Sequence, residues 1–331
     1  MIWALYATLG VNMWTKKHET LDEFENEAWD KVVDACVKEG LNMIVLDIGE
    51  GIEWKSHPEL AVPGAWSYYK VKQEVERLRA LGIALIPKLN FSATHDLWLG
   101  PWRNTKTQKV YYDVCRDLIH EVYDLFEKPE YIHIGMDEEG NAQILEGHGE
   151  GLISFRRGKL LWHDLKFLCD TVADLGATPW IWSDNAFEHP KEFRETISNE
   201  NILISPWHYF AFKEEHYTKI ADHQIYRDFY GKEPYAHMNL TYVEDEPFFV
   251  LYRQEALPLA KDGYKVVPTT STFNGCPYNT DDTVDYYKTY APAESVAGFM
   301  AAPWKHTTME KLPEILEDIR LMGEAKRKYY N

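Results

Sequence analysis

The sequence predicts an α/β fold of the (β/α)8-barrel class, also called a TIM barrel. Two observations predict it: eight short apolar runs alternate with eight longer amphipathic ones, and the chain has 331 residues. Strands that alternate with helices form parallel sheets with the helices outside. Eight such units at this length indicate one closed barrel. A doubly wound open sheet is the alternative, although such sheets seldom hold eight even units.

The predicted elements follow one another along the whole chain. The strands are 2–8, 43–49, 83–90, 131–137, 178–184, 201–209, 265–271 and 296–304. The helices after them lie near 21–39, 67–81, 110–127, 154–175, 190–198, 252–262, 281–290 and 310–328. Glycine separates a helix from the next strand four times, where a left-handed residue is favoured: Gly40, Gly82, Gly176 and Gly263. No linker interrupts residues 1–331, so we expect a single catalytic domain with one long loop insertion at about 210–251.

Charge and terminal composition exclude several kinds of partner. The chain has 53 acidic and 35 basic residues and a net charge of −18, which repels phosphate backbones, so we expect no nucleic-acid partner. No apolar run approaches the ~20 residues of a bilayer span, so we expect no membrane partner. The first residues lack the features of a signal peptide and are predicted as a strand. As written the chain predicts a cytoplasmic protein, and export after removal of a signal stays open.

The four cysteines, Cys36, Cys115, Cys169 and Cys276, stand alone in the sequence. Their spacing suits neither a zinc site nor a disulfide framework. We therefore expect small buried hydrophobic side chains.

Functional residues of a barrel lie at the C-terminal ends of its strands. The predicted strand ends hold carboxylates, tryptophans and histidines. The candidate site consists of Asp47, His95, His133, Asp137, Glu138, Trp182, Asp184, Trp207 and Trp304.

The fourth predicted strand and its end, residues 131–139, are the most informative segment. Side chains alternate between the two faces of a strand, so Ile132, Ile134 and Met136 are expected to face the helices. On the interior face, Gly135 leaves space that a ligand could occupy.

Two adjacent carboxylates, Asp137 and Glu138, stand where this strand ends. They share negative charge, and burial raises the proton affinity of at least one of them. Glycoside hydrolysis needs such a separation of an acid from a carboxylate. The alternative is an acidic cluster that caps a helix.

Tryptophan is the second functional signal. Of twelve tryptophans, Trp182, Trp207 and Trp304 fall at three strand ends. Aromatic faces stack on the C–H faces of sugars, and they also line apolar pockets. No metal or cofactor is expected, although His133, Asp137 and Asp184 leave a metal-dependent hydrolase open as an alternative.

The segment His133-Ile-Gly-Met-Asp-Glu138 resembles the His-x-Gly-Gly-Asp-Glu motif of glycoside hydrolase family 20, the β-N-acetylhexosaminidases. Residues 41–54, 55–60 and 81–87 are similar to the family's segments around strands two and three. Residues 182–184 and 298–304 resemble its fifth and last strands.

This resemblance implies a retaining, substrate-assisted mechanism on a carbohydrate substrate. By analogy, Glu138 is the general acid/base and Asp137 orients the 2-acetamido group. Trp182 and Trp304 wall the pocket. His95 and His133 support the pair by hydrogen bonds. No cofactor is implied.

The sequence also departs from the family pattern. The family's Pro-Glu-x-Asp is here Pro87-Lys-Leu-Asn90, its Trp-x-Glu is Trp304-Lys-His306, and its strand-one arginine has no counterpart. We therefore expect a divergent member. A carbohydrate-binding barrel with little catalysis, or action on an anionic sugar read by Lys88 and Lys305, stays open. The missing N-terminal domain of the family could leave a surface that a homodimer covers.

Overall fold

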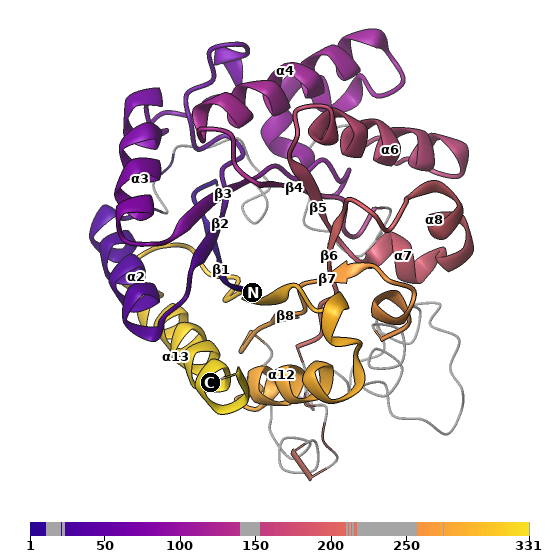
Figure 1. Ribbon diagram of the computed structural model, residues 1–331. Coiled ribbons are helices and arrows are strands. Elements are labelled where there is room, and N and C mark those ends of the chain that lie inside the picture. Colours follow the sequence, from indigo (N-terminus) through magenta and orange to yellow (C-terminus); the bar gives the residue numbers. More distant parts are fainter. Residues whose placement is uncertain are drawn as a thin grey trace, which may run out of the picture.

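The computed structural model describes residues 1–10, 21, 24–139, 153–209, 211, 213, 215–216, 257–273 and 275–330. All strands lie in one sheet in the order β7-β6-β5-β4-β3-β2-β1-β9-β8, and every pair is parallel. The sheet curls into a barrel, and the helices lie outside it (Figure 1). The prediction of an α/β barrel is confirmed. The predicted insertion at 210–251 lies almost wholly outside the described residues.

The observed elements follow the predicted ones, with strands that are shorter except for β1, and the predicted helix 252–262 lies partly outside the described residues. The strands are β1 (Ile2–Thr8), β2 (Met43–Asp47), β3 (Ala84–Lys88), β4 (Tyr131–Gly135), β5 (Thr178–Trp182), β6 (Leu203–Ser205), β7 (Lys265–Val266), β8 (Thr269–Thr270) and β9 (Gly298–Ala301). The α-helices are α2 (Asn26–Glu39), α3 (Tyr68–Ala80), α4 (Lys109–Leu125), α6 (Lys159–Ala173), α7 (Asp184–Glu188), α8 (Pro190–Thr196), α12 (Asn279–Tyr290) and α13 (Leu312–Tyr330). The 3-10 helices are η1 (Pro58–Leu60), η2 (Asp96–Asn104) and η4 (Ala293–Ser295).

The predicted strand 265–271 is divided into β7 and β8. On one side, the amides of Val267 and Thr269 donate to carbonyl groups of the β6 segment, at 2.8 and 2.7 Å. On the other side, the carbonyl groups of Pro268 and Thr270 accept from the β9 segment, at 3.1 and 2.8 Å. Pro268 has no N–H to donate, which interrupts a regular ladder at this point. The segment nevertheless joins β6 to β9.

Side-chain alternation sorts the strand residues into two cores. Ile132, Ile134 and Met136 pack with the helices in the outer core, as predicted. The inner core is smaller and holds Tyr6, Trp180 and Trp182, among others. Burying one such large side chain stabilises the fold by ~1.5–3 kcal/mol. The inner core is thus a packed floor beneath the C-terminal ends of the strands.

The glycines expected at the ends of four helices are also present. The glycines between helix and strand have φ angles of 75°, 78°, 88° and 87°, as a left-handed helix end requires. All four cysteines are buried, as predicted.

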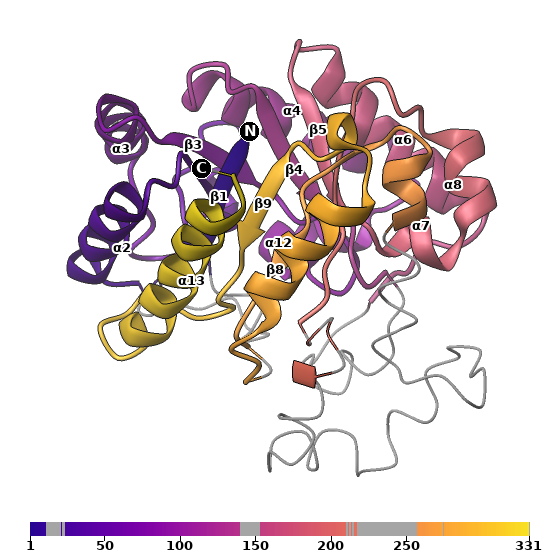
Figure 2. The ribbon, with the colours of Figure 1, turned by 60° about the horizontal axis from the view of Figure 1, so that its bottom comes forward.

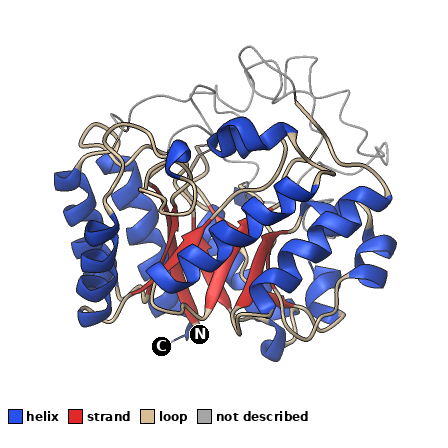
Figure 3. Ribbon diagram, turned by 90° about the horizontal axis from the view of Figure 1, so that it is seen from above, coloured by secondary structure: helices blue, strands red, loops and turns tan. Residues whose placement is uncertain are grey.

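The first and last elements meet at one end of the barrel, where both termini lie (Figure 3). The ring of Trp3 lies 5.4 Å from the ring of Tyr330. Helices α12 and α13 run side by side along the flank next to β8 and β9 (Figure 2). None of the helices in the described part of the chain has the length and apolar character of a bilayer span.

Candidate active site

The candidate site is built on a turn of unusual backbone conformation directly after β4. Gly135, Met136 and Glu138 have φ angles of 71°, 67° and 51°. Left-handed backbone costs a non-glycine residue about 1–2 kcal/mol, so contacts from neighbouring segments must stabilise this turn. The turn ends β4 earlier than predicted and directs two successive carboxylates toward the mouth of the barrel.

Side chains from the segment after β3 hold one side of this turn. Asn90 Oδ1 accepts from the backbone amide of Met136, at 3.4 Å, and Asn90 Nδ2 donates to Asp137 Oδ1, at 2.8 Å. The hydroxyl groups of Ser92 and Thr94 donate to the carbonyl groups of Asp137 and Glu138. Residues 90–94 therefore hold the strained turn through four hydrogen bonds.

His95 bridges the two carboxylates. Its Nε2 lies 3.1 Å from Glu138 Oε2 and 3.4 Å from Asp137 Oδ2. The side chain of Asp137 is 11% exposed, whereas that of Glu138 is 26% exposed. Asp137 is thus held from two directions, and Glu138 is the carboxylate more open to a ligand.

Asp184, the first residue of α7, is the third carboxylate of the site. Its Oδ1 accepts from the backbone amide of Glu138 at 3.1 Å, and its Oδ2 accepts from Trp207 Nε1 at 2.8 Å. Burial and then the charges of Asp137 and Glu138 raise its pKa well above the ordinary value. Both oxygens of this predicted substrate-binding residue are therefore engaged by the protein.

The predicted tryptophans come together as an aromatic group. The ring of Trp304 lies 4.6 Å from Tyr6 and 5.7 Å from Trp182. Trp207 stacks on Tyr209 at 5.4 Å, and Tyr209 lies 6.3 Å from Trp304. Tyr6 and Trp182 are buried, while Trp207 and Trp304 are partly exposed. The group thus forms a buried base with two accessible indole rings.

Two other predicted residues lie deeper in the barrel. His133 is fully buried between Trp180 and Trp182, and its Nδ1 accepts from the amide of Gly135 at 3.0 Å. Burial, followed by the charge of Lys88, lowers its pKa well below the ordinary value, so the ring is neutral. The prediction that His133 supports the carboxylate pair by hydrogen bonds is wrong, because its Nδ1 accepts from Gly135 and its Nε2 has no hydrogen-bond partner among the described residues.

Asp47 belongs to an internal ion pair. Its Oδ2 accepts from the Tyr6 hydroxyl at 2.9 Å and from the ammonium group of Lys88 at 2.5 Å. The Lys88 side chain is completely buried. Lys305 likewise pairs with Glu314, at 2.6 Å. Both lysines behind the anionic-sugar alternative thus already have carboxylate partners.

The space that the sequence assigned to a ligand at Gly135 is occupied by Asn90. A Cβ atom added to Gly135 would lie 2.2 Å from Asn90 Oδ1 and 2.9 Å from Asn90 Cα. That interpretation is corrected: the glycine allows β3 and β4 to approach closely. Asn90 was missed as a site residue together with Ser92 and Thr94. The one sequence signal for it was its place at the predicted end of strand 83–90.

In the alternative of a metal-dependent hydrolase, His133, Asp137 and Asp184 would hold the metal. Within the described ranges, the ligand atoms that gather within 4.8 Å of one another belong to His95, Asp137 and Glu138. His95 lies within hydrogen-bonding or ion-pair distance of both carboxylates, which accounts for this proximity.

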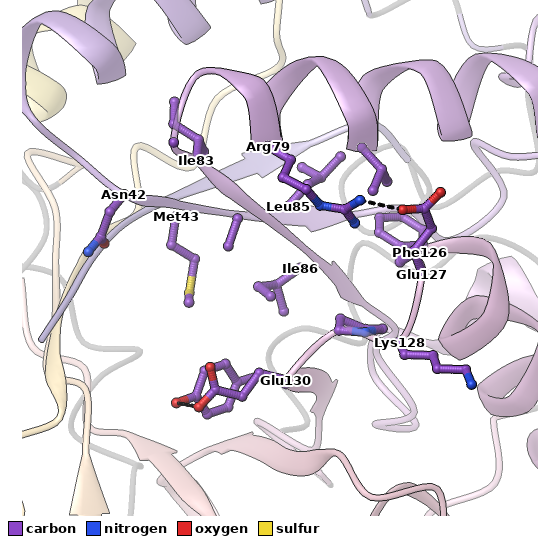
Figure 4. A pocket seen from close by; sticks show the side chains of 15 residues that line it. Asn42, Met43, Arg79, Ile83, Leu85, Ile86, Phe126, Glu127, Lys128 and Glu130 are labelled. Carbon is purple, nitrogen blue, oxygen red and sulfur yellow. Dashed lines mark hydrogen bonds and ion pairs between the residues drawn. The ribbon is translucent and has the colours of Figure 1, made fainter.

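A cavity of about 460 Å³ lies at the opposite end of the barrel (Figure 4). It is lined by the beginnings of β2, β3 and β4 and by the turn after α4, residues 126–130. Arg79 and Glu127 form an ion pair at its rim. No residue of the carboxylate pair or aromatic group lines it. The candidate site residues gather instead at the C-terminal ends of the strands, where barrels carry their functional residues.

Fold and site together define an α/β barrel with a supported carboxylate pair and an aromatic group at one mouth. Comparison with solved structures finds the same fold in glycoside hydrolase family 20. The family 20 β-N-acetylhexosaminidase from Streptomyces coelicolor matches with a TM-score of 0.63 and 12% identity over 97% of this chain. The β-N-acetylhexosaminidase from Bacteroides fragilis matches with a TM-score of 0.61 and 14% identity over 97% of this chain and 66% of its own.

Dispersin B matches with a TM-score of 0.59 and 15% identity over 98% of both chains. This chain spans only 63% of the Streptomyces coelicolor protein. The sequence matches no family model and no curated protein. At these identities the likeness establishes the fold alone.

Proposed function

We propose that this chain is a glycoside hydrolase of the β-N-acetylhexosaminidase kind, acting as a single (β/α)8 catalytic domain in which β7 and β8 count as one strand. The observation that carries the proposal is the geometry of Asp137 and Glu138. They are adjacent, His95 bridges them, and Glu138 is the more exposed. The family 20 fold of the structural neighbours supports the same assignment.

In this mechanism Glu138 acts first as an acid. Its carboxyl proton passes to the glycosidic oxygen as the bond to the anomeric carbon breaks. The carbonyl oxygen of the substrate's own 2-acetamido group attacks that carbon and forms a cyclic intermediate. Glu138, now a carboxylate, then takes a proton from water, which opens the intermediate with net retention.

Asp137 orients the acetamido group. Asn90 donates to its Oδ1, and His95 Nε2 lies 3.4 Å from its Oδ2, so the acetamido N–H would approach Oδ2 beside His95, and the carboxylate would stabilise the positive charge that develops there. Trp304 provides an apolar wall for the acetamido methyl group with the buried Trp182 packed behind it, and Trp207 offers an indole face to the sugar ring. The substrate class is a carbohydrate with a terminal or internal 2-acetamido sugar.

The test compares aryl glycosides with and without the 2-acetamido group, using the wild type, Glu138→Gln and the control Glu192→Gln. Glu192 is an exposed carboxylate in the first turn of α8. We expect turnover of acetamido glycosides only. Loss of the acid at Glu138 should lower the rate by ~10²–10⁴-fold, and more for a poor leaving group than for a dinitrophenyl group. Glu192→Gln should match the wild type, and chelators should have no effect.

Turnover of glycosides that lack the 2-acetamido group would refute the substrate-assisted step but would remain consistent with Glu138 as the acid. Loss of activity on chelation would favour metal-dependent hydrolysis instead. If the wild type binds sugars without turnover, the proposal that the chain is an enzyme is refuted, and a carbohydrate-binding barrel is favoured.

A further inference from the structure

Asp184 stands between the two parts of the site that a substrate would contact. It opens α7 directly after β5, and its side chain reaches both the β4 turn and the end of β6. No other described side chain bonds to both Glu138 and Trp207. Its position thus connects the candidate acid with an accessible indole ring.

The first of its two bonds stabilises the strained turn. Asp184 Oδ1 accepts from the amide of Glu138, whose φ of 51° is unfavourable for a side-chain-bearing residue. The next residue, Asn185, donates from Nδ2 to the Met136 carbonyl at 2.7 Å. Two consecutive residues of α7 therefore hold the turn from the side opposite Asn90, and the direction of the Glu138 carboxyl depends on them.

The second bond fixes an aromatic ring. Asp184 Oδ2 accepts from Trp207 Nε1 at 2.8 Å, and Tyr209 stacks on the Trp207 ring at an interplanar angle of 28°. A bond at the indole nitrogen together with a stacked ring leaves the Trp207 side chain little rotational freedom. Trp207 is partly exposed, so a sugar can lie against what remains of its surface.

We infer that Asp184 is a positioning residue that sets the Trp207 ring and the Glu138 carboxyl in one geometry, so that a sugar ring held on Trp207 presents its glycosidic oxygen to Glu138. This inference rests on the proposed function and deepens it. It revises the sequence-based role of Asp184 as a substrate ligand, because both carboxylate oxygens bond to the protein. Trp207 contacts the sugar, and Asp184 affects sugar binding by holding the Trp207 ring in place.

The test is a double-mutant cycle with Asp184→Ala, Trp207→Phe and the double variant. Trp207→Phe keeps an aromatic face and removes the indole N–H, so we expect KM to rise about 3–10-fold with kcat nearly unchanged. Asp184→Ala should raise KM by the same factor and lower kcat by about 10–100-fold, since it also releases the Glu138 turn. The double variant should match Asp184→Ala. Glu192→Gln, an exposed substitution on α8, is the control.

Effects on KM that multiply in the double variant would overturn the inference, as would an Asp184→Ala variant with the kcat of the wild type. Near-ultraviolet circular dichroism gives a readout that needs no turnover. The spectral change caused by Asp184→Ala should vanish in the Trp207→Phe background, and persistence of that change would refute the link. A wild type without turnover would refute the proposed function, while the spectra would still decide whether Asp184 fixes Trp207.

Discussion

Replacing Gly135 by alanine tests the packing that positions the candidate pair. The new Cβ would lie 2.2 Å from Asn90 Oδ1, 2.4 Å from Asn90 Cγ and 2.9 Å from Asn90 Cα. The side chain of Asn90 must move away, and the backbone after β3 must shift with it. Asn90 would then lose its bonds to Asp137 and to the amide of Met136.

The expected cost has two parts that a control can separate. A left-handed alanine costs about 1–2 kcal/mol, and the overpacking against Asn90 costs about 1–3 kcal/mol more. Gly82 also has a positive φ, of 78°, but a Cβ there would have nothing within 4 Å. Gly82→Ala therefore carries the first cost alone, and Gly135→Ala should be the less stable variant.

The assay is urea unfolding of the wild type and the two variants, followed by circular dichroism and tryptophan fluorescence. We expect the midpoint to fall for both variants and clearly further for Gly135→Ala, with m-values unchanged. Equal midpoints for the two alanine variants would refute the conclusion that Asn90 fills the space beside Gly135. In that case the interpretation of Gly135 as an opening for a ligand would return.

Three further predictions concern other buried polar groups. Arg156→Leu should destabilise the fold by about 3–5 kcal/mol in urea unfolding, because Glu139 and Asp164 would lose their buried cation; an effect as small as that of the exposed Arg320→Leu would contradict this. Burial raises the pKa of Asp318 to about 7, so the folded state keeps a proton that the unfolded chain loses near pH 4. The wild type should therefore lose up to about 4 kcal/mol between about pH 4 and pH 7 relative to Asp318→Asn, and parallel stability profiles would refute the shift. The four buried thiols should not react with a disulfide reagent in the native protein and should all react in denaturant.

The alternation of apolar and amphipathic segments was sufficient to predict the barrel and the place of its strands. The alternation of side chains between the two faces of β4 and the glycines after the helices depend on local geometry, which the chain itself encodes. The strand-end rule then identified most of the side chains that gather at the mouth. The place of Asp137 and Glu138 needed no knowledge of loops, because parallel strands deliver their ends to the same side, whereas His95 reaches the pair from the segment between β3 and η2.

The partners of these side chains were decided by the tertiary structure. The bond between Asn90 and Asp137 joins residues 47 positions apart and depends on the left-handed turn that ends β4. The pairing of β4 with β5 also shifts register between His133 and Gly135, and strand parity does not specify such a shift. The division of the seventh strand at Pro268 follows from its pairing on both sides.

The sequence by itself therefore determined the class of fold, the location of the site and the residue types available there. Only the tertiary structure decided that Asn90 fills the space at Gly135, that Lys88 neutralises Asp47, and that Asp184 joins Glu138 to Trp207. The physical reason is that periodicity and strand ends are properties of neighbouring residues. A hydrogen bond between distant segments instead depends on register and turn direction, and a shift of one residue reverses the face that each side chain occupies.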